Sequence, residues 1–331
     1  NELNDELDLA AGFPVLYSYN EGSVTSGWVD YNTPGDPLTP LSGYAANFGS
    51  SGAQMTADMT GTVTNGALFS TFTNHNNTYT KGFNLAGNPY PSPINWNASA
   101  GWTKTNIDNA LYFFRASTTD EYGGTYSTYI NGISSDGLAS PVIASMQGFF
   151  IHVSDGAFPV TGTLGLDNRV RLTTLTPLLA KSDEEAPSGI LNLTASCASD
   201  PLSSDPSVIY FDEKAGSGFD AMLDALKLMN TDYYVPNLYS VGSDGKKLSI
   251  NALPPSNDTL RVIPLGLKTD IDGDVVFRLE EMPDEITGAR IYLLDKLTQV
   301  ETEMSEGSEY HVSLEPGDYS GRFFLNMRST A

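Results

Sequence analysis

Apolar residues in this chain occur in short runs that turn-forming residues interrupt. In the first half such runs are Phe13–Tyr19, Gly27–Tyr31, Ala110–Phe114 and Gly148–Val153. Short runs rich in aromatic and β-branched residues, bounded by Gly, Asn, Asp and Ser, are typical of β-strands. Their spacing, with a turn signal about every ten residues, favours a β-sandwich or a β-barrel.

The second half repeats this pattern with one exception. Strand-like runs cover Gly189–Thr194, Ser207–Phe211, Val275–Leu279, Ala289–Leu294 and Arg322–Met327. In contrast, Phe219, Met222, Leu223 and Leu226 recur at the spacing of one helix face. The sequence therefore predicts a short helix over residues 219–229.

One segment between the two halves has the composition of a linker. Lys181–Gly189 is charged and then rich in Pro, Ser and Gly, and apolar segments lie on both sides of it. We predict an all-β fold of two tandem antiparallel β-sandwich (jelly-roll-like) domains with one short helix. The predicted domains are residues 1–172 and 189–331, joined by a linker over 173–188.

Composition narrows the class of ligand. The chain has 40 acidic and 17 basic residues, a formal net charge of −23. Such a chain repels nucleic acids and anionic membrane surfaces, whereas cations and neutral ligands such as glycans remain open. No apolar run reaches the length of a membrane span, so we expect no membrane insertion. Cys197 is the single cysteine, which excludes an intrachain disulfide. The sequence does not determine the oligomeric state.

Several motifs occur in an order that resembles a known family. The first half contains Gly87-Asn88-Pro89-Tyr90-Pro91-Ser92 and Met146-Gln147-Gly148-Phe149-Phe150, and the second contains Val208–Phe211, Gly245–Asn251 and the ending Tyr319–Leu325. This order is similar to that of a module common near the C-terminal end of surface proteins that Bacteroidetes export by the type IX pathway. The resemblance implies secretion or surface display and transfers no catalytic residue. It also implies a sorting domain just downstream, which these residues do not include.

The residues that enzymes use to activate a nucleophile are scarce. Two of the three histidines, His152 and His311, lie in strand patterns, and His75 lies in an Asn-rich loop. No Gly-x-Ser-x-Gly elbow, phosphate-binding loop or His/Cys zinc cluster occurs. Glycoside hydrolysis needs only two carboxylates and is not excluded by counting. We nevertheless expect no enzymatic activity and name no catalytic residue.

One acidic string has the spacing of a cation site. Asp270, Asp272 and Asp274 alternate along Thr269–Asp274, just before a predicted strand, and could give calcium several oxygen ligands. The string lacks the other EF-hand positions, and Asp and Gly are also the residues of an ordinary turn. A structural calcium ion is therefore one hypothesis and a plain turn the other; no other cofactor is expected.

Aromatic side chains are the candidates for glycan contact. Trp96 and Trp102 flank a polar segment, and Tyr122 and Tyr126 lie in a Gly-rich stretch. Sugars stack their apolar C–H faces on flat aromatic rings, while nearby Asn or Asp side chains bind the hydroxyls. The alternative is that the tryptophans pack beneath the loop, as large aromatic residues usually do.

A modification site follows from the resemblance. Bacteroidetes attach O-linked glycans at Asp followed by Ser or Thr and then an aliphatic residue, and Asp258-Thr259-Leu260 matches this pattern. Thr259 follows the Pro-containing segment Pro254–Asn257, where a hydroxyl is expected to be exposed. The resemblance therefore marks Thr259 as a candidate for O-glycosylation.

Taken together, these observations favour a non-catalytic extracellular or cell-surface module for adhesion, scaffolding or ligand presentation. The alternative is a glycan-binding accessory module of a larger secreted protein, and a carboxylate-based hydrolase is a distant third. The expected partner is a glycan or a surface protein. An exposed platform of Trp96 and Trp102 would favour the glycan hypothesis, whereas buried tryptophans would favour an adhesin or spacer.

Overall fold

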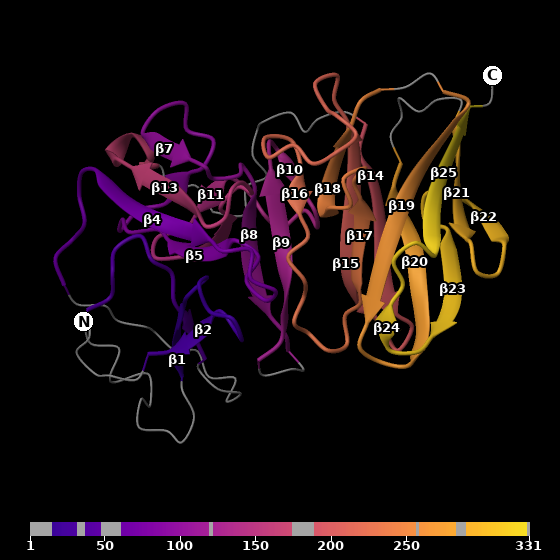
Figure 1. Ribbon diagram of the computed structural model, residues 1–331, viewed down its shortest axis with the longest axis horizontal. Coiled ribbons are helices and arrows are strands. Elements are labelled where there is room, and N and C mark those ends of the chain that lie inside the picture. The colour runs from indigo at the N-terminus through magenta and orange to yellow at the C-terminus, as the bar shows by residue number, and fades with distance from the viewer. Residues whose placement is uncertain are drawn as a thin grey trace. The chain divides into compact units, whose positions relative to one another are not determined.

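The structure is a computed structural model, and it describes residues 15–31, 37–47, 61–118, 122–173, 189–255, 258–282 and 289–329. Within these ranges the regular elements are β-strands, apart from the 3₁₀ turn η1 (Asn168–Val170) (Figure 1). The prediction of an all-β chain is confirmed. None of the helical segments in the described ranges is long and apolar enough to cross a membrane.

The helix predicted over residues 219–229 is wrong. The segment forms a turn at 221–223, followed by strand β16 (Ala225–Leu226), which pairs with β18 (Lys247–Leu253). Aspartate side chains take the backbone N–H groups here: Asp220 accepts from Met222, and Asp224 accepts from Asp220 and Ala252. Such local bonds compete with the helix ladder, so apolar spacing alone was misleading.

The chain forms two compact units. The first consists of residues 1–113 and 140–182, and the second of residues 114–139 and 183–331. The break after residue 182 falls in the predicted linker, of which residues 174–188 lie outside the described ranges. The second unit also takes residues 114–139 from within the predicted N-terminal domain. The subdivision into two tandem jelly-roll-like sandwiches stays a prediction.

The first unit is built from several small sheets. Two three-stranded sheets have the orders β2-β1-β3 and β4-β13-β7. In a third sheet, β12 pairs with β5 and with the first residues of β8. A fourth, two-stranded sheet consists of β6 and β11. The strands are β1 (Leu16–Tyr19), β2 (Trp28–Asp30), β3 (Ala45–Ala46), β4 (Leu68–Asn74), β5 (Phe83–Gly87), β6 (Ile94–Asn95), β7 (Trp102–Thr105), β8 (Leu111–Ala116), β11 (Val142–Ile143), β12 (Gly148–His152) and β13 (Val160–Leu166).

The sequence motifs of the first unit supply its core. Tyr90, from the Gly87–Ser92 motif, is fully buried, and so is Phe149 from the Met146–Phe150 motif. β12 and β5 pair along their whole length, from Gly148 opposite Gly87 to His152 opposite Phe83. Both motifs are therefore structural, which agrees with their Pro-rich and aromatic composition.

The second unit is dominated by one large sheet with the order β22-β21-β25-β19-β17-β18-β15-β14-β20-β23 (Figure 1). Met304 of β22 and Leu314 of β23, the two end strands, belong to the same hydrophobic core, so the sheet curls around it. The strands are β9 (Gly124–Ile130), β10 (Ile133–Ser134), β14 (Leu191–Cys197), β15 (Asp200–Phe211), β16, β17 (Asn237–Val241), β18, β19 (Leu260–Thr269), β20 (Gly273–Glu281), β21 (Ala289–Asp295), β22 (Val300–Met304), β23 (Glu309–Leu314), β24 (Gly317–Asp318) and β25 (Phe323–Ser329). β15 and β18 pair in parallel, which departs from the predicted antiparallel arrangement.

Candidate functional site

The two tryptophans of the predicted glycan site form a closed pair. Trp96 is 2% exposed and its indole N–H donates to the carbonyl of Asn109 at 2.8 Å. Trp102 is half-buried and donates to the carbonyl of Asn95 at 2.8 Å. The ring centroids are 4.8 Å apart and the planes make an angle of 66°. This pair is not an exposed platform, because Trp96 packs beneath the loop.

The chain's own lysine lies against these rings. Lys104 Nζ is 3.4 Å from the centroid of the Trp96 ring and 5.5 Å from that of Trp102. The same nitrogen approaches the Trp96 carbonyl at 3.4 Å and Asn109 Oδ1 at 3.3 Å. Burial lowers the pKa of Lys104 to about 7. Lys104 thus occupies ring surface that a sugar would need.

The two tyrosines of the prediction belong to the second unit, whereas the tryptophans belong to the first. Tyr122 is 57% exposed, but Tyr126 is buried and packs against Phe114 with ring centroids 5.4 Å apart. Two further aromatic residues, Tyr233 and Tyr234, are also exposed. They come directly after residues 231 and 232, whose backbone N–H groups donate to the carbonyl of Gly124. The Tyr122 side chain is therefore the more exposed of the two, whereas the Tyr126 ring has little exposed surface.

Of the alternating aspartates, Asp270 and Asp272 lie in the turn between β19 and β20, and Asp274 is the second residue of β20. Asp270 pairs with Lys268 at 2.7 Å, and Asp274 accepts a hydrogen bond from the Ser313 hydroxyl. Asp272 is exposed. Within the described ranges, no group of three or more His, Cys, Asp or Glu side chains is placed to hold a metal ion. These contacts are those of an ordinary turn, and calcium binding at this turn stays a prediction.

Two histidines pair with buried carboxylates in the first unit. His152 Nδ1 lies 2.5 Å from Asp108 Oδ2, and its Nε2 lies 2.9 Å from the carbonyl oxygen of Lys81. Both ring nitrogens therefore lie within hydrogen-bonding distance of an oxygen. The hydroxyl of Ser154 donates to Asp108 rather than to the imidazole. This arrangement differs from a nucleophile–histidine–carboxylate relay, in which the hydroxyl bonds to the ring.

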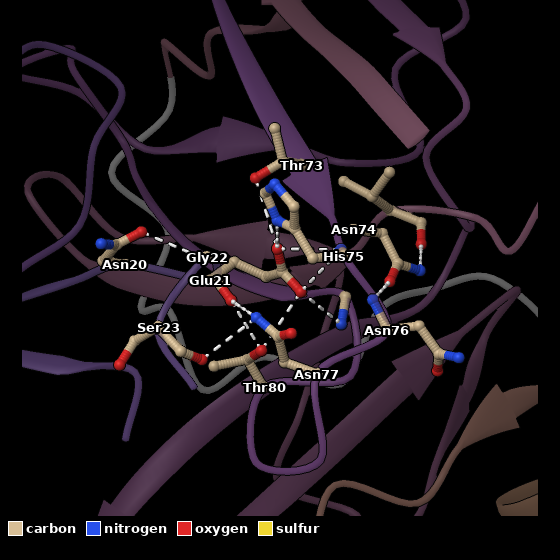
Figure 2. A network of polar contacts seen from close by, with 12 residues as sticks. Asn20, Glu21, Gly22, Ser23, Thr73, Asn74, His75, Asn76, Asn77 and Thr80 are labelled. Atoms are coloured by element: carbon tan, nitrogen blue, oxygen red, sulfur yellow. Dashed lines mark hydrogen bonds and ion pairs between the residues drawn. The ribbon is translucent and has the colours of Figure 1, made fainter. Parts of the chain in front are cut away.

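The second pair, Glu21 and His75, is part of a larger network (Figure 2). Glu21 is 3% exposed, and its carboxylate lies 2.7 Å from His75 Nδ1. It also accepts the backbone N–H groups of His75 and Gly82 at 3.1 Å and the hydroxyls of Thr80 and Thr73. With these donors the carboxylate is fully satisfied, so it anchors the turn after β1 to the loop between β4 and β5. Sequence reasoning missed Glu21, because a lone Glu in an Asn-Glu-Gly turn gives no signal of burial.

A different surface has the features of a binding site. The three strands of the sheet β4-β13-β7 each contain Thr-x-Thr, namely Thr71-Phe72-Thr73, Thr161-Gly162-Thr163 and Thr103-Lys104-Thr105. Because side chains alternate along a strand, both threonines of each motif point to the same face. The other face is buried, as Phe72, Leu164 and Leu166 show.

The strand register aligns these threonines into rows. Thr163 of the central strand is opposite Thr71 on one side and Thr105 on the other. In the row on one side of it, Gly165 lies between Phe69 and Thr103. In the row on the other side, Thr161 is opposite Thr73. We call this surface the threonine face and define it by the following residues: Phe69, Thr71, Thr103, Thr105, Thr161, Thr163 and Gly165. Thr73 is not included, because its hydroxyl donates to Glu21.

The Phe69 ring leans over Gly165 on this face. A Cβ on Gly165 would be 2.2 Å from Phe69 Cδ1 and 3.2 Å from Thr103 Cβ, so the ring covers the glycine. The Phe69 side chain is nevertheless 65% exposed. No residue of the threonine face is titratable, in a chain with a net charge of −23. Thr-x-Thr also occurs elsewhere in the sequence, at residues 60–64, 78–80 and 174–176, so only the strand register shows that these three copies are neighbours.

Comparison with known proteins gives a family but no activity. Residues 11–327 match the family described as "Domain of unknown function (DUF8693)". No curated protein matches the sequence. Among solved structures, the secreted serine protease VesC from Vibrio cholerae matches with 14% identity and a TM-score of 0.14. That match covers 81% of this chain and 45% of the protease, and a TM-score this low carries no argument.

Proposed function

The chain belongs to the DUF8693 family, and we propose that it is a non-catalytic glycan-binding module of a secreted or cell-surface protein. The observation that carries this proposal is the exposed Phe69 ring, which leans over Gly165 among rows of threonine side chains. The site differs from the one expected at Trp96 and Trp102, where Trp96 is buried.

The chemistry of the threonine face suits a neutral sugar. A flat aromatic ring offers its face to the C–H groups of a pyranose, which are apolar on one side of the ring. Threonine hydroxyls both donate and accept hydrogen bonds, as sugar hydroxyls do. Thr103 flanks the Phe69 ring, and Thr71, Thr163 and Thr105 form the adjacent row. Stacking and hydroxyl contacts are thus available side by side.

The charges of the threonine face and of the whole chain favour a neutral sugar over an anionic one. The threonine face has no Lys or Arg that could pair with a uronate or sulfate group. The net charge of −23 repels polyanions at longer range as well. The proposed ligand is therefore a neutral polysaccharide.

The extracellular location rests on the resemblance of the Gly87–Ser92 and Met146–Phe150 motifs to exported Bacteroidetes surface proteins. In that setting, glycan binding would serve adhesion or would hold a larger protein on its substrate. A module of this kind needs no catalytic group, which agrees with the carboxylate–histidine pairs described above, because neither presents a hydroxyl to the imidazole ring.

Affinity electrophoresis in gels containing neutral polysaccharides tests this proposal. Phe69→Ala should weaken retention about ten-fold, the effect of losing roughly 1.4 kcal/mol of stacking. Tyr79→Ala is the matched control, because Tyr79 is 68% exposed in the same unit but lies outside the threonine face. Retention that is unchanged in Phe69→Ala, or lost instead in Tyr122→Ala, would contradict binding at this face.

A further inference from the structure

The side chains of the threonine face are short. Apart from Phe69, its residues carry side chains no longer than threonine, and the Phe69 ring leans across the sheet over Gly165, so the face has low relief. The long side chain of β7, Lys104, points to the opposite face, where it contacts Trp96. No wall or groove is formed by the residues of the face itself.

The face is also periodic. Neighbouring strands in a sheet lie about 4.8 Å apart, and alternate residues of one strand repeat roughly every 6.7 Å. The row Thr71–Thr163–Thr105 therefore presents three hydroxyls at the strand spacing, and a second row follows with Phe69, Gly165 and Thr103. An array of this kind matches a ligand that is itself extended, flat and regularly spaced.

Flatness also determines which physical form of ligand is favoured. A flat face contacts a dissolved chain from one side only, so the chain loses conformational freedom while most of its hydroxyls stay hydrated. In an ordered solid the chains are already immobile, and several of them meet all rows of the face at once. The entropic cost is then small and the contacts are numerous.

We infer that the threonine face binds the surface of an ordered, insoluble neutral polysaccharide made of extended β-linked chains, in preference to the same polysaccharide in solution. This inference rests on the proposed function, since it specifies the physical form of the ligand for the same face. Phe69 stacks on the C–H face of one sugar ring, and Thr71, Thr103, Thr105 and Thr163 bind hydroxyls of neighbouring rings.

Depletion of the purified full chain from solution tests the inference. The solids are microcrystalline cellulose and crystalline chitin, each compared with its swollen amorphous form, and the dissolved probes are cellohexaose and chitohexaose. We expect depletion by at least one crystalline solid to exceed that by its amorphous form about ten-fold per unit of accessible area. Titration with the matching hexasaccharide should give binding at least about ten-fold weaker than binding to the crystalline solid.

A charge variant tests the role of flatness. Thr163→Lys places a long charged side chain on the central strand and should abolish binding to the crystalline solid. Thr78→Lys is the matched control, because it makes the same change at an exposed position outside the face and should bind as the parent does. Equal thermal unfolding of both variants excludes misfolding as the cause of a loss.

The outcomes separate the inference from the proposed function. Binding of the dissolved or amorphous forms that equals binding of the crystalline solids and depends on Phe69 would overturn the preference for an ordered surface while supporting glycan binding. Failure to bind any of these forms, together with no retention in the polysaccharide gels, would overturn both. Crystal binding that survives in Thr163→Lys would show that another surface is responsible.

Discussion

Phe69 and Gly165 face each other directly across strands β4 and β13, and the phenyl ring of Phe69 lies where a side chain of residue 165 would stand. The backbone of Gly165 is not in the left-handed region, so it does not require glycine for its conformation. What requires glycine is the ring itself. The absence of one Cβ therefore lets the Phe69 ring lean over the neighbouring strand on an exposed face of the sheet.

Gly165→Ala tests this relationship. The new methyl group would lie 2.2 Å from Phe69 Cδ1, so the ring must rotate away from the sheet. We expect polysaccharide retention to fall about ten-fold and the free energy of unfolding to fall by about 1–3 kcal/mol. Gly148→Ala in strand β12 is the control, because a Cβ on Gly148 would make only ordinary contacts, the nearest at 3.6 Å. Equal losses in the two variants would contradict a specific role for the Phe69 ring.

Glu21 provides a prediction about stability. Glu21→Ala leaves the buried N–H groups of His75 and Gly82 without their acceptor, so the first unit should lose about 3 kcal/mol. Glu309→Ala is the matched control, since Glu309 also pairs with a histidine, His311, but on the surface. Exposed pairs of this kind contribute less than about 1 kcal/mol.

Tryptophan fluorescence measures the effect on the first unit alone. All three tryptophans, Trp28, Trp96 and Trp102, belong to that unit. Denaturant titrations followed at this signal should shift for the Glu21 variant and stay in place for the Glu309 variant. A Glu21 variant that unfolds at the parent's denaturant concentration would show that the network contributes little.

Asp224 gives a prediction about pH. Burial is the main cause that raises the pKa of Asp224 to about 6; the backbone N–H groups of Asp220 and Ala252 oppose this shift, and the nearby Asp220 and Asp244 carboxylates add to it. The folded state therefore binds this proton more tightly than the unfolded state, whose pKa is 3.8. Below pH 3.8 the group contributes no penalty, stability falls as pH rises from 3.8 to 6, and the full penalty remains above pH 6.

Asp224→Asn removes the charge and with it this pH dependence. The stability of the variant relative to the parent should improve between about pH 4 and pH 6 by up to about 3 kcal/mol and stay constant above that range. Calorimetric melting of the second unit at several pH values measures the difference. A stability difference that does not change over this interval would show that Asp224 titrates at its ordinary pKa.

Sequence reasoning succeeded where the pattern was local. Short apolar runs such as Gly148–Val153 gave the all-β class, because alternation and turn residues act within a few positions. It failed at residues 219–229, where the Asp220 and Asp224 side chains accept backbone hydrogen bonds and compete with the helix that the apolar spacing predicts. It also could not find the threonine face, because Phe69 and Gly165 meet only through the strand register.

The tryptophan pair illustrates the same limit. Trp96 and Trp102 flank a polar loop, which is where an exposed platform would be expected. The deciding residue was Lys104, whose ammonium group lies 3.4 Å from the centre of the Trp96 ring. Lys104 lies two residues after Trp102 on β7 and so on the same face, but the sequence does not show that this face packs against Trp96.

Thr259 remains a candidate for O-glycosylation. The residue is exposed just before β19, as the predicted modification requires. In protein purified from the organism that encodes it, intact mass should exceed the sequence mass by that of a glycan, and Thr259→Val should remove the difference. A peptide that contains Thr259 and is entirely unmodified would reject the hypothesis.

The final prediction concerns residues 114–139, which belong to the second unit although they precede the linker by many residues. Their contacts with the rest of that unit include buried or partly buried hydrogen bonds between these pairs: Tyr126 N–H to Asn230 Oδ1 at 3.0 Å, Asn192 Nδ2 to the Ser135 carbonyl at 3.3 Å, and Ser249 Oγ to Thr128 Oγ1 at 3.4 Å. Without residues 114–139 these groups lose their partners and apolar surface becomes exposed.

A fragment of residues 189–331 alone should therefore melt at lower temperature than the second unit does in the full chain, or aggregate. Fusing residues 114–139 to its N-terminus through a flexible Gly-Ser linker should restore the melting temperature, because the linker lets the β9–β10 hairpin reach its native position. A fusion with the same residues in scrambled order controls for added length. If the fragment 189–331 melts cooperatively at the temperature of the second unit in the full chain, residues 114–139 are not part of that unit's stable core, and the boundary at 173–188 separates two self-sufficient domains.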